Sequence, residues 1–206
     1  MLGQKISLPS DIDTVLFHLS PQEKHVFVKG ISLGMTIHPW STWLDTCFVK
    51  LNGLNIELGP LGIIGGMWGT AFGLIGVKDE NGKKTSFFSN SGYPDSVFHV
   101  KYGTYVNGIS LSVGGLIETF NNGLIMNGIS CVSYKTKGLL ISGLLNSTYE
   151  FKGVNIAGLG NMSHKGYGVQ IGLINNCKTG QVLQFGLFNR IGNRVIPFIN
   201  FRLQKE

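Results

Sequence analysis

The stretch Gly138-Leu-Leu-Ile-Ser-Gly-Leu-Leu-Asn146 recurs as Gly153-Val-Asn-Ile-Ala-Gly-Leu-Gly-Asn161 and again as Gly168-Val-Gln-Ile-Gly-Leu-Ile-Asn175. Two earlier glycines open similar phrases. The five opening glycines are spaced 15 residues apart: Gly108, Gly123, Gly138, Gly153 and Gly168. A further copy at residues 182–189 follows after 14 residues and lacks the opening glycine. A fixed spacing of this length indicates a repeat protein, in which each unit is one structural element stacked on the next.

Within each unit, apolar residues stand one and three places after the glycine, as in Leu139 and Ile141. This period of two predicts a strand with one buried face, so we expect these apolar residues in the core. A second glycine, such as Gly143, then interrupts the alternation and predicts a corner or a bulge that lets the strand bend, after which the buried set resumes out of phase at Leu144. The equivalent pairs in the flanking units are Gly128 with Ile129 and Gly158 with Leu159.

Each unit closes on an asparagine, and two architectures fit a strand, a bend and a turn of this length. These asparagines are Asn146, Asn161, Asn175 and Asn189. In a parallel β-solenoid each unit is one coil, and the asparagines stack as a hydrogen-bonded ladder. In an antiparallel β-meander or a small outer-membrane β-barrel, residues 176–180 and 190–193 are hairpin turns. The constant bend and the repeated asparagine favour an all-β, repeat-built parallel solenoid with about 15 residues per unit.

The 206 residues suit one continuous domain, and the composition excludes a disordered chain and a coiled coil, because 30 residues are glycine and only 14% are charged. We expect an N-terminal arm or cap at residues 1–25. An irregular β-rich first half with insertions should follow at 26–105. Regular repeats with a C-terminal cap, formed by the strand around Pro197, should occupy 106–206.

The first half contains two segments that depart from the repeat. Residues 78–84 hold Asn81-Gly82 among charged residues and predict a hairpin turn. The run 58–77 carries no charge and contains seven glycines and Pro60. Its length also fits a membrane helix, but the glycines favour buried strands over a short core helix or a membrane-inserted segment.

Charge is distributed unevenly. Residues 1–120 carry eight Lys/Arg against nine Asp/Glu, whereas residues 121–206 carry nine against two. The cations of the second half occur singly, which indicates a solvated basic edge, and no module that reads nucleic acid is present. Seven of the nine are Lys135, Lys137, Lys152, Lys165, Lys178, Arg190 and Arg194.

No motif for catalysis, for a cofactor or for a metal ion is found, so the sequence predicts a protein that is not an enzyme. Cys47, Cys131 and Cys177 lack zinc or disulfide spacing and are expected to be buried apolar groups. Asp45 and Glu57 are the acids in apolar surroundings and are the one conceivable glycosidase pair, although Glu57 is expected to point outward. Six aromatic residues are expected to pack in the core and the cap, and the alternatives are a sugar platform or a membrane-interface belt: Trp40, Trp43, Trp68, Tyr93, Tyr102 and Tyr105.

The phrases Gly168-Val-Gln-Ile-Gly-Leu-Ile-Asn175 and Gln184-Phe-Gly-Leu-Phe-Asn189, with the ending Arg194-Val-Ile-Pro-Phe-Ile-Asn-Phe201, resemble a family of bacterial surface-repeat proteins. That family, of leptospiral and Bacteroidetes type, carries repeated G-[VL]-Q-[IL]-G-L-x-N phrases. The resemblance covers most of residues 106–201 and implies an exported or surface-associated protein without an assigned activity.

We therefore expect a non-enzymatic, exported envelope or surface repeat protein with a structural or binding role and no cofactor. Its expected partner is an envelope component or a glycan, and the composition allows membrane association. The alternatives are an integral outer-membrane β-barrel and a carbohydrate-binding or carbohydrate-active β-helix. Residues 1–4 lack a complete signal peptide, so we expect export if translation starts upstream of Met1 and a cytoplasmic location if it starts there.

Overall fold

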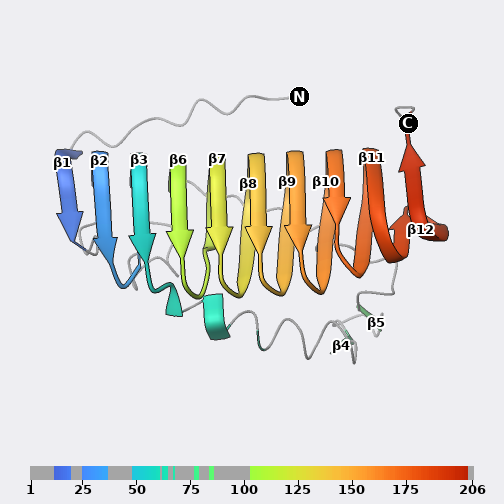
Figure 1. Cartoon of the computed structure of the whole chain (residues 1–206). Helices are drawn as coiled ribbons and strands as arrows, with labels where there is room; N and C mark the ends of the chain where they lie inside the picture. The colour runs from blue at the N-terminus through green and yellow to red at the C-terminus, as the bar shows by residue number, and fades with distance from the viewer. Residues whose placement is uncertain are drawn as a thin grey trace.

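The structure is a computed structural model that describes residues 12–19, 25–36, 48–60, 62–64, 67, 77–78, 84–85 and 103–203. One sheet holds ten strands, and all neighbours from β1 to β11 run parallel, so the fold is a β-solenoid of about eight turns (Figure 1). In sheet order the strands are β1 (Asp13–Leu19), β2 (His25–Gly34), β3 (Phe48–Glu57), β6 (Thr104–Ser112), β7 (Ile117–Asn127), β8 (Ser130–Ser142), β9 (Leu145–Ala157), β10 (Gly160–Ile171), β11 (Ile174–Ile191) and β12 (Arg194–Arg202).

Each regular coil is one long curved strand followed by a two-residue turn. Between β8 and β9 this turn is Gly143 and Leu144. The opening glycines pair in register across neighbouring strands, with Gly138 opposite Gly153. The pairing confirms that one 15-residue unit is one coil, and it selects the parallel solenoid over the antiparallel meander.

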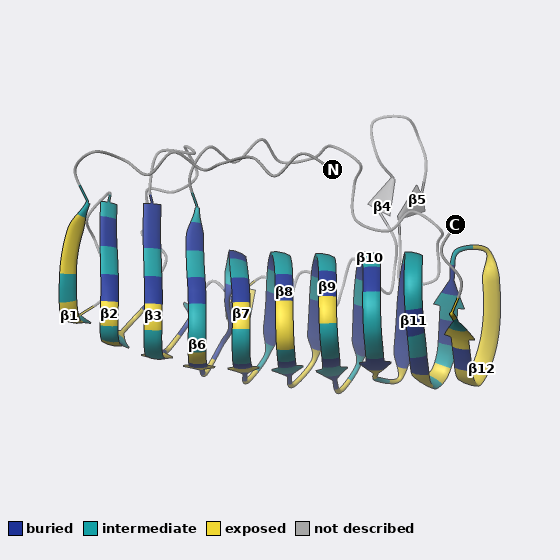
Figure 2. Ribbon diagram, turned by 90° about the horizontal axis from the view of Figure 1, so that it is seen from above, coloured by how far each residue is buried: buried dark blue, intermediate teal, exposed yellow. Residues whose placement is uncertain are grey.

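The interior face is the opposite of the one predicted from the alternation. In β8, Leu139 and Ile141 point outward and are half-buried, whereas Leu140 between them and Ser142 after them are buried. The residue predicted to resume the buried set, Leu144, is 40% exposed. A coil of 15 residues encloses a narrow interior, and small or amide side chains fit there because they bond to the coil above and below. The same bands of buried and exposed residues repeat from coil to coil (Figure 2).

The predicted asparagine ladder is present and is buried. Asn146 Nδ2 donates to Asn161 Oδ1 at 3.0 Å, and Asn161 Nδ2 donates to Asn175 Oδ1 at 2.9 Å. Asn175 continues the ladder to Asn189 at 2.8 Å. Each rung also bonds backbone, as in the bond from Asn161 Nδ2 to the carbonyl of Ile171. The ladder therefore fixes both the stacking of the coils and the closure of each turn.

The two glycines of each unit have different structural roles. The opening glycine has a positive φ, 109° at Gly138 and 132° at Gly153, and it bends the strand. The second glycine, at Gly143 and Gly158, lies at the predicted corner, in the turn between strands and outside the positive-φ region. There the backbone approaches the coil below so closely that a Cβ at Gly143 would stand 2.0 Å from the carbonyl oxygen of Gly128.

The C-terminal end of the stack reverses direction. β12 pairs antiparallel with β11, and its arrow points against the others in Figure 1. The hairpin turn predicted at residues 190–193 is confirmed, with Gly192 at its tip. The other predicted turn, at residues 176–180, is wrong, because these residues lie within β11. Pro197 stands where the β11–β12 register shifts, a place that proline tolerates because the ladder is interrupted.

The first half follows the same coil with insertions. β1 lies within the segment predicted as an arm and pairs parallel with β2. A long insertion separates β3 from β6, and it contains the short antiparallel pair β4 (Val77–Lys78) and β5 (Lys84–Thr85), which confirms the predicted hairpin. In the run 58–77, residues 60, 62–64 and 67 are helical, so strands were the wrong prediction for them. This helix packs so closely that a Cβ at Gly62 would stand 2.3 Å from the backbone nitrogen of Gly115, and Ser130 Oγ donates to the Gly62 carbonyl at 2.6 Å.

Candidate binding face

Two rows of apolar side chains point outward along all ten strands of the sheet, and we call this surface the apolar face. The strand pairing places each residue beside its equivalent on the next strand. One row is Phe17, Ile31, Leu54, Ile109, Leu124, Leu139, Val154, Val169, Leu183 and Phe201. The other row is Leu19, Leu33, Ile56, Leu111, Met126, Ile141, Ile156, Ile171, Phe185 and Ile199. Every position in both rows is apolar and none is buried.

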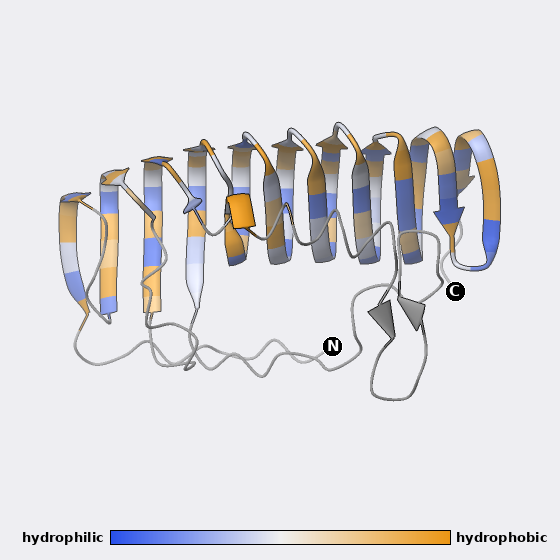
Figure 3. Ribbon diagram, turned by 90° about the horizontal axis from the view of Figure 1, so that it is seen from below, coloured by the Kyte–Doolittle hydropathy of each residue, from blue (hydrophilic) through white to orange (hydrophobic). Residues whose placement is uncertain are grey.

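A third line of apolar residues in the turns widens the apolar face. In this line, Leu144, Leu173 and Leu187 are 40%, 48% and 62% exposed, and Val113 lies beside it with 63% exposed. Ten strands at about 4.8 Å spacing and the two full rows, with the width of their side chains, give a strip about 43 Å by 15 Å, or roughly 650 Å². The largest apolar patch on a typical monomer is about 300–600 Å². The hydrophobic segments recur at corresponding places of successive coils (Figure 3).

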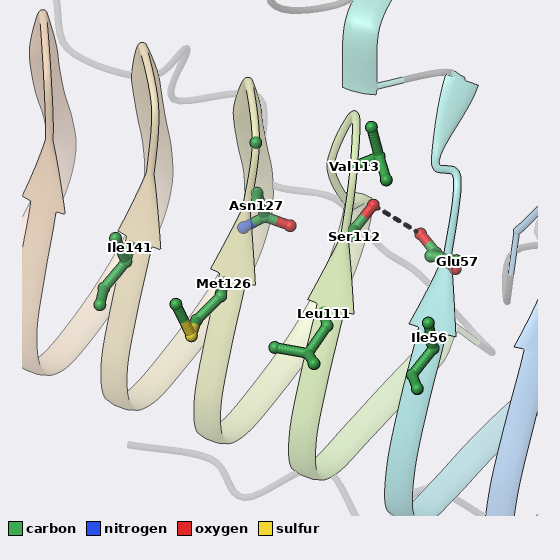
Figure 4. A pocket seen from close by; sticks show the side chains of 9 residues that line it. Ile56, Glu57, Leu111, Ser112, Val113, Met126, Asn127 and Ile141 are labelled. Atoms are coloured by element: carbon green, nitrogen blue, oxygen red, sulfur yellow. Dashed lines mark hydrogen bonds between the residues drawn. The ribbon is translucent and has the colours of Figure 1, made fainter.

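A groove of about 330 Å³ lies on the apolar face near the long insertion. Ile56, Leu111, Met126 and Ile141 line it, and Glu57 lies beside them (Figure 4). The side chain of Glu57 was expected to point outward, but it faces the interior and is only 4% exposed. Ser112 Oγ donates to Glu57 Oε1 at 3.3 Å. The carboxylate is thus hydrogen-bonded to the neighbouring strand, and most of the other residues that line the groove are apolar.

Lysines flank the apolar face along its glycine-bend side. The residue immediately before the bend is exposed and cationic in three coils, at Lys29, Lys137 and Lys152. The equivalent position in other coils carries a neutral polar residue, as at Asn122. We call these three side chains the lysine rim. They place positive charge next to an uncharged apolar surface.

Beyond the lysine rim, the next side of each coil carries aromatic and basic residues. Phe120 stacks on Tyr105, with ring centroids 4.7 Å apart, and contacts Tyr134 on its other side at 5.1 Å. Lys135 and Glu150 form an ion pair at 3.1 Å. Burial raises the pKa of Tyr105. A small groove of about 210 Å³ is lined by Tyr105, Asn107, Phe120, Asn121, Asn122, Lys135 and Lys137.

The structure brings few of the predicted site residues together. Asp45 lies outside the described residues, so the conceivable pair with Glu57 is not described. Trp40, Trp43, Trp68, Tyr93, Tyr102 and Cys47 also lie outside them. Cys131 and Cys177 are free and buried, as predicted, and burial raises the pKa of each thiol to about 12. Across the described part of the chain, no three His, Cys, Asp or Glu side chains are grouped closely enough to hold a metal ion.

The apolar face was missed because its residues were assigned to the core. The sequence signal for the apolar face is the row of residues that lies between its two outward rows and is partly polar. This inner row is Ser110, Ile125, Leu140, Asn155, Gln170 and Gln184. No helix in the described ranges is long and apolar enough to cross a bilayer. Comparisons with protein families, with curated proteins and with solved structures gave no match. Any function must therefore be argued from the geometry itself.

Proposed function

We propose that this protein is a non-enzymatic solenoid of the bacterial cell envelope that acts by binding through its apolar face. The observation that carries the proposal is the unbroken pair of outward apolar rows on all ten strands. The resemblance of the repeat phrases to surface proteins supports the location. The grouping of titratable side chains in the described residues suggests no reaction, because the one buried acid, Glu57, is bound to a neighbouring serine.

Exposing so large an apolar strip to water is energetically unfavourable. At about 25 cal/mol per Å² of apolar surface, covering roughly 650 Å² contributes on the order of 15 kcal/mol before the cost of association. Packing within the coil does not require these residues outside, because the interior is already filled by the buried rows. An apolar face that is not needed for folding is expected to be a binding surface.

The experiment is cell fractionation with a variant that changes only this surface. The full chain is expressed with an export signal, and Val154→Asn with Ile156→Asn is compared with the wild type. We expect the wild type in the envelope fraction, released by detergent, and the variant in the buffer-soluble fraction. Ser147→Asn with Tyr149→Asn alters the same coil on another side and should leave the distribution unchanged. Equal distribution of all three proteins would contradict the proposal.

A second candidate function is glycan binding at the aromatic groove. The aromatic rings of Tyr105 and Phe120 line this groove together with the amides of Asn107 and Asn122, a combination of groups that suits sugars. The test is a glycan-dependent rise in melting temperature that is lost in Asn107→Ala with Asn122→Ala. A rise that survives in this double variant would exclude the groove as the site.

A further inference from the structure

We propose that the occupant of the apolar face is an anionic lipid surface, with the lysine rim at the level of the headgroups. This inference rests on the proposed function and names the partner. Three observations favour lipid over a second copy of the chain: the shape of the strip, the state of its backbone, and the sign of the charge around it.

The strip is straight and shallow, which suits a planar partner. Its side chains come from equivalent positions on successive strands, such as Leu139, Val154 and Val169, so they stand at one level. A bilayer accepts such a surface at the boundary between headgroups and acyl chains, where buried apolar area and attraction to anionic lipids add together. The groove at Leu111 and Met126 offers space for part of an acyl chain within the same level.

The backbone beneath the strip is already hydrogen-bonded. The parallel ladders pair each coil with the coil on either side, and the turns continue the pairing, as from Leu144 N–H to the Ile129 carbonyl at 2.8 Å. Unpaired backbone groups are what exclude most irregular structure from hydrocarbon. Contact with lipid requires that backbone N–H and C=O groups be hydrogen-bonded within the protein. The turns at the margin of the strip meet this requirement, whereas an ordinary loop surface does not.

The charge around the strip has one sign. Within the described ranges, the acids are Asp13, Glu57, Glu118 and Glu150, of which Glu57 is buried and Glu150 is paired with a lysine. The lysine rim is exposed and has no acid in its row. Two copies packed face to face with their rims on the same side would repel each other, whereas an anionic lipid surface attracts the rim.

The experiment is cosedimentation of the purified full chain with vesicles. One set contains equal parts of phosphatidylglycerol and phosphatidylcholine, and the other contains phosphatidylcholine alone. We expect at least tenfold tighter binding to the anionic set, weakening as salt is raised. Val154→Asn with Ile156→Asn, and separately Leu139→Asn with Ile141→Asn, should abolish it. Circular dichroism verifies that each variant is folded, and the two pairs guard against one failing to fold.

A matched pair of variants isolates the lysine rim. Lys137→Gln with Lys152→Gln should weaken binding to anionic vesicles by roughly 10–30-fold, since each lysine near the surface contributes separately. Lys165→Gln with Lys178→Gln removes the same net charge away from the bend and should weaken it far less. Equal loss in both pairs would show that only net charge matters and would overturn the role of the rim.

The outcomes separate this inference from the proposed function. One outcome is that the protein binds neither vesicle set and forms a dimer, and that Val154→Asn with Ile156→Asn makes it monomeric. The occupant of the apolar face is then a second copy of the chain. The lipid inference is then overturned, while the apolar face remains the binding surface. If the apolar variants change neither vesicle binding nor oligomeric state nor fractionation, both the inference and the proposed function fail.

Discussion

Asn161 is held on both sides by its own equivalents from neighbouring coils. It accepts a hydrogen bond from Asn146, donates to Asn175, and also donates to the carbonyl of Ile171. Because the side chain is fully buried, no water replaces these partners when it is removed. A single residue therefore holds three coils in register.

Asn161→Ala is expected to lower the free energy of unfolding by about 2–4 kcal/mol, because it leaves buried donors and acceptors unpaired. Asn122→Ala, at an exposed asparagine three coils away, should change it by less than about 0.5 kcal/mol. Urea denaturation followed by circular dichroism measures both. A similar loss in the two variants would mean that the ladder is not a source of stability.

The buried thiols predict a loss of stability at high pH. Burial raises the pKa of Cys131 and Cys177 to about 12 from an ordinary 9.0, so the folded protein keeps protons that the unfolded chain releases. Stability from these groups is complete below pH 9 and falls toward pH 12. Each thiol contributes a slope of about 1.4 kcal/mol per pH unit over that window.

Unfolding free energies at pH 8, 9 and 10 test this slope. The wild type should lose stability between pH 9 and 10, and Cys131→Ala with Cys177→Ala should lose less. Both thiols should also resist alkylation at pH 8 until urea is added, because they are buried and protonated. An unchanged slope in the double variant would assign the alkaline loss to other groups.

The alternation of residues predicts the strands, but it does not predict which face is inside. The inward row holds Leu140 but also Asn155 and Gln170, so hydrophobicity alone assigns it to the surface. Its polar members are satisfied by other coils, as in the bond from Gln184 Nε2 to Gln170 Oε1 at 2.8 Å. Such bonds depend on the stacking itself, and a single unit read from the sequence contains only one of the two partners.

At the scale of the element, the coil is shaped by two glycine positions with different requirements. A Cβ at Gly138 would stand 2.3 Å from the Gly123 carbonyl oxygen, at a φ of +109° that favours glycine. A Cβ at Gly143 would meet a carbonyl just as closely, without a positive φ. The sequence predicts that glycines recur here, but the backbone that excludes a side chain comes from the next coil.

Gly138→Ala and Gly143→Val should each destabilise the protein by about 2–4 kcal/mol, because the stacked backbone must move apart. Gly160→Ala is the matched control. Its Cβ would stand 3.3 Å from the nearest atom, and equivalent positions carry Leu145 and Ile174, so we expect a loss below about 1 kcal/mol. Melting curves measure the stability of the three variants relative to the wild type. An unchanged melting temperature in Gly138→Ala would refute the steric account of the bend.

At the scale of the whole molecule, the solenoid is a stack whose coils contact only their neighbours. Removing residues 145–159 deletes one complete coil and places Gly160 beside Ser130 with the register kept. Stability of such stacks is close to a sum over coils and their interfaces, so the shortened chain should fold with a lower urea midpoint.

A deletion of eight residues, 145–152, is the control for this experiment. It shifts the pairing by part of a coil and moves outward residues to the interior, so we expect loss of the folded β signal in circular dichroism. If both deletions fold equally well, the 15-residue coil is not the unit of assembly. If neither folds, the coils depend on contacts beyond their immediate neighbours.

The reversed strand at the C-terminal end has a consequence for how this architecture changes size over evolution. Because β12 runs antiparallel to β11, a duplicated unit placed after it would have no parallel edge to join. A unit duplicated between β6 and β11 meets parallel neighbours on both sides and lengthens the apolar strip by about 4.8 Å. The number of internal duplications would then set the reach of the surface in fixed steps, while both ends stay unchanged.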